Sequence, residues 1–132
     1  MEYTEGMSHG GSELLVVLST FPSAEAAGEV AFVLVAEGLC ACVNILPHMR
    51  SIYQWQGEVA NNAECLCLIK TTAERFPQLK ERLAELHGYE VPEIVALRAA
   101  EVSQSYLDWV VAETDPKKAP PSAEAGAGES EA

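Results

Sequence analysis

The sequence is poor in basic side chains and has no long apolar run. Of its 132 residues only 8 are Lys or Arg, against 20 Asp or Glu, which gives a net charge of −12. Such a field repels phosphate backbones and anionic lipid, so nucleic acid and membranes are disfavoured as partners. No apolar stretch approaches the roughly 18 residues that a membrane span needs. The composition predicts a soluble globular protein that attracts cations.

The N-terminus also lacks an export signal, because Met1 to Ser12 is polar and rich in glycine. We therefore expect a cytoplasmic protein whose four cysteines stay reduced. Residues 1–11 and 114–132 differ in composition from the rest, and we expect a disordered leader and a disordered tail there. The intervening domain, residues 12–113, has fourteen acidic and six basic side chains, a difference of −8. Its acidity is therefore not an effect of the tails.

Strand and helix signals alternate along the domain. Leu14–Leu18 is a short apolar run, typical of a buried strand. Ser23 is a candidate N-cap for a helix over about Ser23 to Glu37. A long strand over Cys42–Trp55 follows, with Pro47 predicting a bulge or an edge position. Gln56-Gly57 is a turn candidate that would join it to a second strand, Glu58–Lys70, as a hairpin.

The second half of the domain repeats the helix and strand signals. Thr71-Thr72-Ala73-Glu74 resembles a capping box for a helix running to about His87. Pro77 would disturb such a helix, which predicts an irregular first turn or a start nearer Pro77. Ile94–Leu97 predicts a fourth strand, and the spacing of apolar residues over Tyr106–Val110 indicates a short closing helix.

This order predicts an α+β fold, the ferredoxin-like β-α-β-β-α-β antiparallel sheet with an extra C-terminal helix. Both crossover helices of that fold cover the same face of the sheet. The first and third strands are nevertheless apolar at consecutive positions, so both faces of the sheet carry hydrophobic side chains. We expect another copy of the chain to cover the second face.

Several motifs then identify a family. From Leu15 to Val110, roughly three quarters of the chain, the sequence resembles the CutA divalent-cation tolerance proteins. The matching motifs are Thr20-Phe21-Pro22-Ser23, Ala41-Cys42-Val43-Asn44-Ile45, Ile52-Tyr53-Gln54-Trp55-Gln56-Gly57, Glu64, Ile69-Lys70-Thr71, Leu86-His87-Gly88-Tyr89-Glu90-Val91-Pro92-Glu93-Ile94 and Tyr106-Leu107-Asp108-Trp109. The resemblance implies a tight homotrimer similar to the PII signalling proteins, a link to copper and other divalent metals, and no enzymatic activity. Ser19 and Leu86 replace a Cys and a His that the family's metal set contains, so His87 is the retained ligand.

His87 is the centre of the predicted metal site. Glu90 and Glu93 follow it closely, and an imidazole with two carboxylates suits Cu(II) or another borderline divalent cation. Cys42 is a further candidate because its motif is one that carries the resemblance. The alternative is a histidine that only ends a helix, where a cation interacts favourably with the helix dipole. No cofactor is expected to be obligatory.

The resemblance also implies a cleft between subunits lined by Glu64, Lys70, Tyr89 and Trp55. Lys70 could meet an anion there or pair with Glu64 or Glu90, and a purely structural ion pair is the alternative. Trp55 is expected to pack in an interface. If the cleft takes a small anionic ligand or a protein partner, the protein is a PII-like sensor or docking module, which is the alternative to metal binding.

The four cysteines form two C-x-C pairs, Cys40 with Cys42 and Cys65 with Cys67. Zinc knuckles use two to four intervening residues, so buried structural thiols are favoured over a zinc site. A hairpin turning at Gln56-Gly57 would also place Cys65 near His48 and Cys67 near Leu46, away from Cys42. The sequence therefore predicts a cytoplasmic trimer that binds divalent metal weakly and contributes to metal tolerance.

Overall fold

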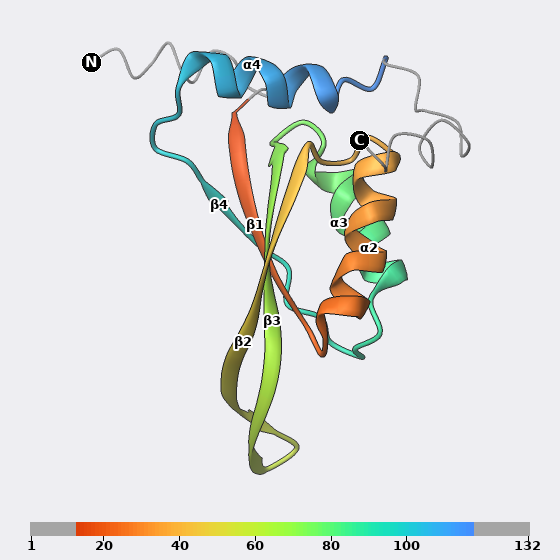
Figure 1. The fold of residues 1–132 in the computed structure, drawn as a ribbon, viewed down its shortest axis with the longest axis vertical. Coiled ribbons are helices and arrows are strands. Elements are labelled where there is room, and N and C mark those ends of the chain that lie inside the picture. Colours follow the sequence, from red (N-terminus) through yellow and green to blue (C-terminus); the bar gives the residue numbers. More distant parts are fainter. Residues whose placement is uncertain (1–12, 118–132) are drawn as a thin grey trace.

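The computed structural model describes residues 13–117, in which four strands and three helices alternate (Figure 1). The elements are β1 (Leu14–Phe21), α2 (Ala24–Ala36), β2 (Cys42–Trp55), β3 (Glu58–Thr72), α3 (Phe76–Leu86), β4 (Val95–Arg98) and α4 (Gln104–Glu113). The predicted leader, and all of the predicted tail beyond Lys117, lie outside the described residues. Thr114, at the predicted start of the tail, is buried, and its hydroxyl donates to the Val110 carbonyl at the end of α4.

The strands form one antiparallel sheet in the order β2-β3-β1-β4. Helices α2 and α3 lie together on one side of this sheet, and α4 crosses one end of it (Figure 1). The predicted β-α-β-β-α-β order with an appended helix is thus confirmed. We call the side covered by α2 and α3 the helix face and the other side the open face.

Helix α2 has the bounds that its local signals predict. The Ser23 side chain accepts a hydrogen bond from the Ala26 amide at 3.1 Å, which satisfies one of the free amides of the first turn. Glu25 lies in that turn, where the helix dipole favours an acid. Gly38, with φ of 72°, follows the C-cap Glu37 and lets the chain turn back toward β2.

Helix α3 begins later than the apparent capping box suggests. Thr71 and Thr72 continue β3, where they pair with Leu15 and Leu14. The capping-box prediction is therefore wrong, because strand pairing takes these residues before a helix can start. The helix begins at Phe76 with Pro77 in its first turn, where the missing amide hydrogen costs nothing. The predicted start near Pro77 is confirmed.

The hairpin of β2 and β3 extends well beyond the rest of the sheet (Figure 1). Gln56 and Gly57 have φ of 51° and 84°, so the predicted turn is present. A bulge between Leu46 and Met49 adds one residue to β2, and His48 takes a φ of 66° there. Cys67 therefore pairs with Ile45, so the predicted pairing of Cys67 with Leu46 is wrong by one residue.

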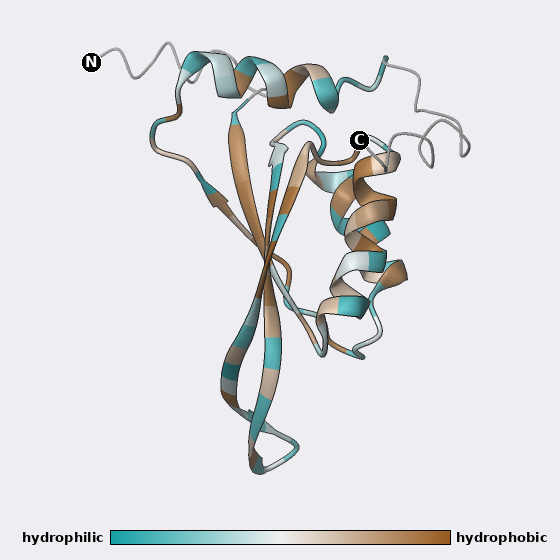
Figure 2. Cartoon of the chain, in the orientation of Figure 1, coloured by the Kyte–Doolittle hydropathy of each residue, from teal (hydrophilic) through white to brown (hydrophobic). Residues whose placement is uncertain are grey.

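The main core lies between the helix face and the two crossover helices. Val17 and Ile69 pair across β1 and β3 and contact the apolar sides of α2 and α3, where Leu34, Leu79 and Leu83 are fully buried. A second, smaller cluster joins α4 to the end of the sheet through Leu14, Ala41 and Val110. Figure 2 shows the hydrophobic residues of β1 and the middle of the sheet beside these helices.

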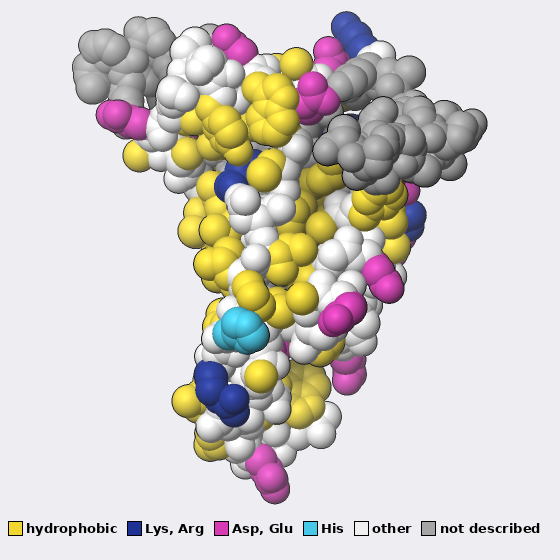
Figure 3. Space-filling view, viewed as in Figure 1, with side chains coloured by type: hydrophobic (Ala, Val, Ile, Leu, Met, Phe, Trp, Pro, Cys, Tyr) yellow, Lys and Arg dark blue, Asp and Glu magenta, His cyan; other side chains and the backbone are white. Residues whose placement is uncertain are grey.

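The open face is also apolar, as the consecutive hydrophobic residues predict. Leu66 of β3 pairs with Leu46 of β2, and Leu18 of β1 lies on the same side of the sheet, two positions along from the partner of Leu66. Val95 and Leu97 of β4 share this side. Leu46, Val95 and Leu97 remain 44%, 44% and 49% exposed. Figure 3 shows hydrophobic side chains gathered between α4 and the hairpin. The described residues of one chain therefore leave a hydrophobic sheet surface uncovered.

Ser19 offers a direct test of the packing on the helix face. Its hydroxyl is fully buried without a hydrogen-bond partner among the described residues, whereas the Ser23 hydroxyl caps α2. An unpaired buried hydroxyl loses its hydrogen bonds to water on folding and gains none in the protein. Ser19→Ala should therefore raise the free energy of unfolding by about 1 kcal/mol. Ser23→Ala removes the same atom and should lower it by about 1 kcal/mol. Denaturant titration of both variants measures the two shifts, and equal signs would contradict this account.

Candidate functional site

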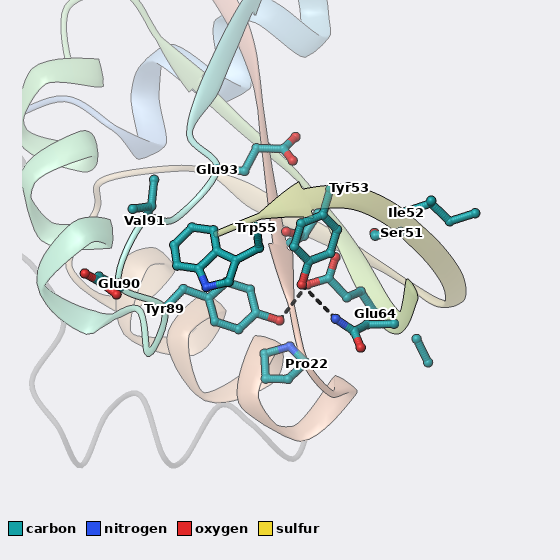
Figure 4. Close-up of a pocket in the computed structure, with 13 residues that line it drawn as sticks. Pro22, Ser51, Ile52, Tyr53, Trp55, Glu64, Tyr89, Glu90, Val91 and Glu93 are labelled. Atoms are coloured by element: carbon teal, nitrogen blue, oxygen red, sulfur yellow. Dashed lines mark hydrogen bonds between the residues drawn. The ribbon is translucent and has the colours of Figure 1, made fainter. Parts of the chain in front are cut away.

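A hollow of the described chain lies where the hairpin leaves the sheet. Its volume is about 910 Å³, and residues of β1, β2, β3 and the loop between α3 and β4 form its wall. Figure 4 shows the side chains around it. The lining residues are Thr20, Pro22, Ser51, Ile52, Tyr53, Trp55, Asn62, Ala63, Glu64, Tyr89, Glu90, Val91 and Glu93. We call this hollow the hairpin pocket.

A buried carboxylate and a tyrosine close the inner side of the hairpin pocket. Glu64 on β3 is only 7% exposed, and its Oε2 accepts a hydrogen bond from the Tyr89 hydroxyl at 2.6 Å (Figure 4). Burial, the bond to Glu64 and the charge of Glu64 together raise the pKa of Tyr89. The phenol therefore stays protonated and donates to the carboxylate at neutral pH.

His87 anchors the loop that carries Tyr89. Its Nε2 lies 2.8 Å from the Thr20 carbonyl, and its Nδ1 accepts from the Tyr89 amide at 3.1 Å. A carbonyl can only accept, so Nε2 carries the proton and the ring is the neutral tautomer. The ring also stacks on Phe21 with centroids 4.2 Å apart and 17° between the planes. Burial lowers the pKa of His87 more than the bond to Thr20 and the charge of Glu64 raise it.

The four residues of the predicted metal set do not meet in one protomer. Glu90 and Glu93 are exposed on the rim of the hairpin pocket, whereas both ring nitrogens of His87 are already engaged. Cys42 pairs with Lys70, and Lys70 pairs with β1 four residues before Thr20, the residue that His87 contacts. At 3.3 Å per residue, Cys42 therefore lies about 13 Å along the sheet from the row of Thr20. Within residues 13–117 no group of three or more His, Cys, Asp or Glu could hold a metal ion.

The predicted cleft residues divide between two places. Glu64, Tyr89 and Trp55 line the hairpin pocket, but Lys70 does not. The Lys70 ammonium instead donates to the Asn44 side chain. Cys42 contacts the same Asn44 side chain and also interacts with Tyr106 of α4. Within one protomer Lys70 forms neither of the predicted ion pairs, with Glu64 or Glu90, because it lies six positions along β3 from Glu64. Among the described residues that line the hairpin pocket there is no Lys or Arg.

The cysteines are free thiols, three of them buried. Burial raises the pKa of Cys40 to about 12 and that of Cys67 to about 11. Thiols held protonated in this way are poor nucleophiles and poor metal ligands. Cys42 is half-buried on the open face, while Cys67 belongs to the core on the helix face. The described structure therefore keeps the two C-x-C pairs from forming one tetrahedral site.

Among the pocket residues that the predicted site does not include are Tyr53, Asn62 and Thr20. The Tyr53 hydroxyl accepts a hydrogen bond from the Asn62 side chain at 2.7 Å (Figure 4). Counting outward from the Gln56-Gly57 turn would have placed Tyr53 and Asn62 on the same side of the hairpin as Glu64. Thr20 carries no such signal, because its role is to offer a backbone carbonyl to His87.

The fold and this site define a class, a small ferredoxin-like α+β protomer with an acidic, aromatic-walled pocket beside a long hairpin. The family model described as CutA1 divalent ion tolerance protein matches residues 15–113. The chain therefore belongs to the CutA1 family, as the motifs indicated.

Relatives with names and structures agree with this assignment. The divalent-cation tolerance protein CutA of Thermus thermophilus is 58% identical over 95 residues, which cover 72% of this chain and 92% of that protein. The CutA of Pyrococcus horikoshii is 38% identical, covering 76% and 98%. The solved Thermus thermophilus structure aligns with a TM-score of 0.71 at 57% identity over 74% of this chain and 94% of that one. The Oryza sativa CutA1 structure gives 0.77 at 36% identity, covering 81% and 98%.

None of the helices in residues 13–117 is both long and apolar enough to cross a membrane.

Proposed function

We propose that this protein acts in divalent-cation tolerance as a homotrimer that binds divalent cations weakly, Cu(II) among them. Membership of the CutA1 family is the observation that carries the proposal, since relatives over most of its length are named for this tolerance. The role is one of binding rather than of catalysis. A cytoplasmic location stays a prediction, because one solved relative is named periplasmic and another relative is named chloroplastic.

The hydrophobic open face supports the trimer. Leu46, Val95 and Leu97 lie on it with 44% to 49% of their surface exposed, and large apolar patches on small proteins mark interaction sites. The hairpin of β2 and β3 extends past β1, so its outer part has no strand beside it within the described chain. Other copies of the same chain would cover the face and pair with this hairpin.

Carboxylates support the metal-binding part of the proposal better than the histidine does. Metal binding at either His87 nitrogen would break its bond to Thr20 or to Tyr89 and leave a buried polar group unpaired. Glu90 and Glu93 are exposed on the pocket rim and have no cationic partner in the described chain. Two carboxylates without further ligands bind a divalent cation weakly. Of the divalent first-row metals, Cu(II) has the highest affinity for such ligands.

Titration of Cu(II) into the purified protein tests this site. The double variant Glu90→Gln with Glu93→Gln should bind Cu(II) about tenfold more weakly than wild type at about pH 7, a loss of about 1.4 kcal/mol measured by calorimetry. The matched control is Glu25→Gln with Glu29→Gln, which neutralises two exposed carboxylates on α2. The control should bind as wild type does.

The same titration separates the carboxylates from the histidine. A folded His87→Ala variant should keep most of its copper affinity, because the ring is not a ligand in this arrangement. If His87→Ala lost copper while the Glu90 and Glu93 variant retained it, the imidazole would be the ligand and the carboxylate site would be wrong.

A small anionic ligand, the alternative considered from the sequence, finds little support in the hairpin pocket. Three carboxylates line it, Lys70 lies elsewhere, and no Lys or Arg is among its lining residues. Such a surface repels anions.

A further inference from the structure

The carboxylate of Glu64 forms no ion pair within residues 13–117. Glu64 is 7% exposed, and its Oε2 accepts from Tyr89, but no Lys, Arg or His in residues 13–117 forms an ion pair with it. Buried charges in proteins are normally paired, because desolvation without a partner is costly. The inner side of the hairpin pocket therefore has negative charge to offer to a positively charged ligand.

Aromatic rings stand around this carboxylate. Trp55 and Tyr53 project from β2 and Tyr89 from the loop after α3, all near Glu64 in Figure 4. Trp55 and Tyr53 are 42% and 40% exposed, and neither ring stacks on another aromatic ring of the described chain. Exposed tryptophan and tyrosine faces attract cations through the ring quadrupole, and tryptophan does so most strongly.

The size and the chemistry of the pocket together select a ligand class. A volume of about 910 Å³ is large for a metal ion and lies in the range of small-molecule sites. The carboxylates disfavour anions, and the described residues offer no cluster of three metal-binding side chains. A ligand with an apolar body and a weakly hydrated positive charge would match both the rings and Glu64.

We propose that the hairpin pocket binds a small organic cation of the alkylated ammonium class, with its charge beside Glu64 and its alkyl groups against Trp55, Tyr53 and Tyr89. This proposal goes beyond divalent-cation tolerance and does not depend on it. The divalent-cation site uses Glu90 and Glu93 at the rim, whereas the organic cation uses the inner wall.

Choline and its neutral analogue 3,3-dimethylbutan-1-ol provide the test, because they have nearly the same shape and differ in charge. Titrated into the full-length protein and followed by the indole fluorescence and by calorimetry, choline should bind about tenfold more tightly than the neutral analogue. Equal binding of the two compounds, or no binding of choline at millimolar concentration, would overturn the proposal. If the hairpin of another copy fills the pocket, choline should not bind at millimolar concentration.

Two pairs of variants locate the binding. Trp55→Leu should weaken choline binding about tenfold, and Trp109→Leu should not change it, although Trp109 on α4 is 44% exposed and thus closely matched to Trp55. Glu64→Gln should weaken choline binding about fivefold. Its control, Glu101→Gln, should leave choline binding unchanged, because the Glu101 side chain is exposed outside the pocket. If Glu64→Gln fails to fold, the Trp55 pair decides.

The outcome is independent of the metal titration. Choline binding that is lost in Trp55→Leu but kept in Trp109→Leu supports the organic-cation site whatever happens with Cu(II). Choline binding unaffected by both Trp55→Leu and Glu64→Gln would show that the pocket is not the site.

Discussion

Wild-type protein at micromolar concentration should sediment at three times its protomer mass of 14.2 kDa. The double variant Leu46→Asp with Leu97→Asp should sediment as a monomer. Both leucines lie on the open face, where they are 44% and 49% exposed in one chain and would be buried in a trimer. Taking a carboxylate out of water without a partner costs several kcal/mol. The concentration at which the trimer of the double variant dissociates should therefore be at least about a thousandfold higher than that of wild type.

Phe32→Asp is the matched control for this experiment. Phe32 is 56% exposed, but it lies on α2, which covers the opposite face of the sheet. The control should remain a trimer. A wild type that sediments as a stable monomer, or a Phe32→Asp variant that dissociates as the leucine variant does, would show that the open face is not the interface.

His87→Ala should lower the free energy of unfolding by about 3 kcal/mol. The substitution leaves the Thr20 carbonyl and the Tyr89 amide without their partners and removes the ring that stacks on Phe21. Each unpaired buried group costs about 1–3 kcal/mol, and the stacked pair contributes about 0.5–1.5 kcal/mol. Denaturant titration at fixed protein concentration measures the change.

His48→Asn provides the comparison for His87→Ala. His48 is exposed on the bulge with φ of 66°, a backbone conformation that asparagine tolerates. The free energy of unfolding of the His48→Asn variant should differ from that of wild type by less than about 0.5 kcal/mol. If the two substitutions had equal effects, His87 would be no more than a helix-end residue.

The same histidine should make the stability depend on pH. Burial holds the pKa of His87 below its ordinary value of 6.5, so the unfolded chain takes up a proton more readily than the folded one. Its stabilising contribution is complete above about pH 6.5 and falls as the pH drops through the folded-state pKa. The difference between wild type and His87→Ala should therefore shrink from pH 7 toward pH 5. Parallel pH profiles would contradict the assignment.

Local signals in the sequence were sufficient for the order of the elements. Ser23 and the turn at Gln56-Gly57 act on their immediate neighbours, so helix α2 and the hairpin follow from short stretches of sequence. The consecutive apolar residues of β1 and β3 predicted that both faces of the sheet would be hydrophobic, because side chains alternate along a strand. The motifs also identified the family, which the match over residues 15–113 confirms.

The tertiary structure decided what the candidate site residues contact. The sequence places His87 next to Glu90 and suggests a metal ligand, but folding brings the Thr20 carbonyl to one ring nitrogen and the Tyr89 amide to the other. Glu64 and Lys70 share a strand and a side of the sheet, yet only Glu64 meets the loop after α3. Such contacts join residues up to 67 positions apart. Periodicity and caps report neighbours along the chain, so this sequence determined its elements, while packing between distant segments determined its pocket.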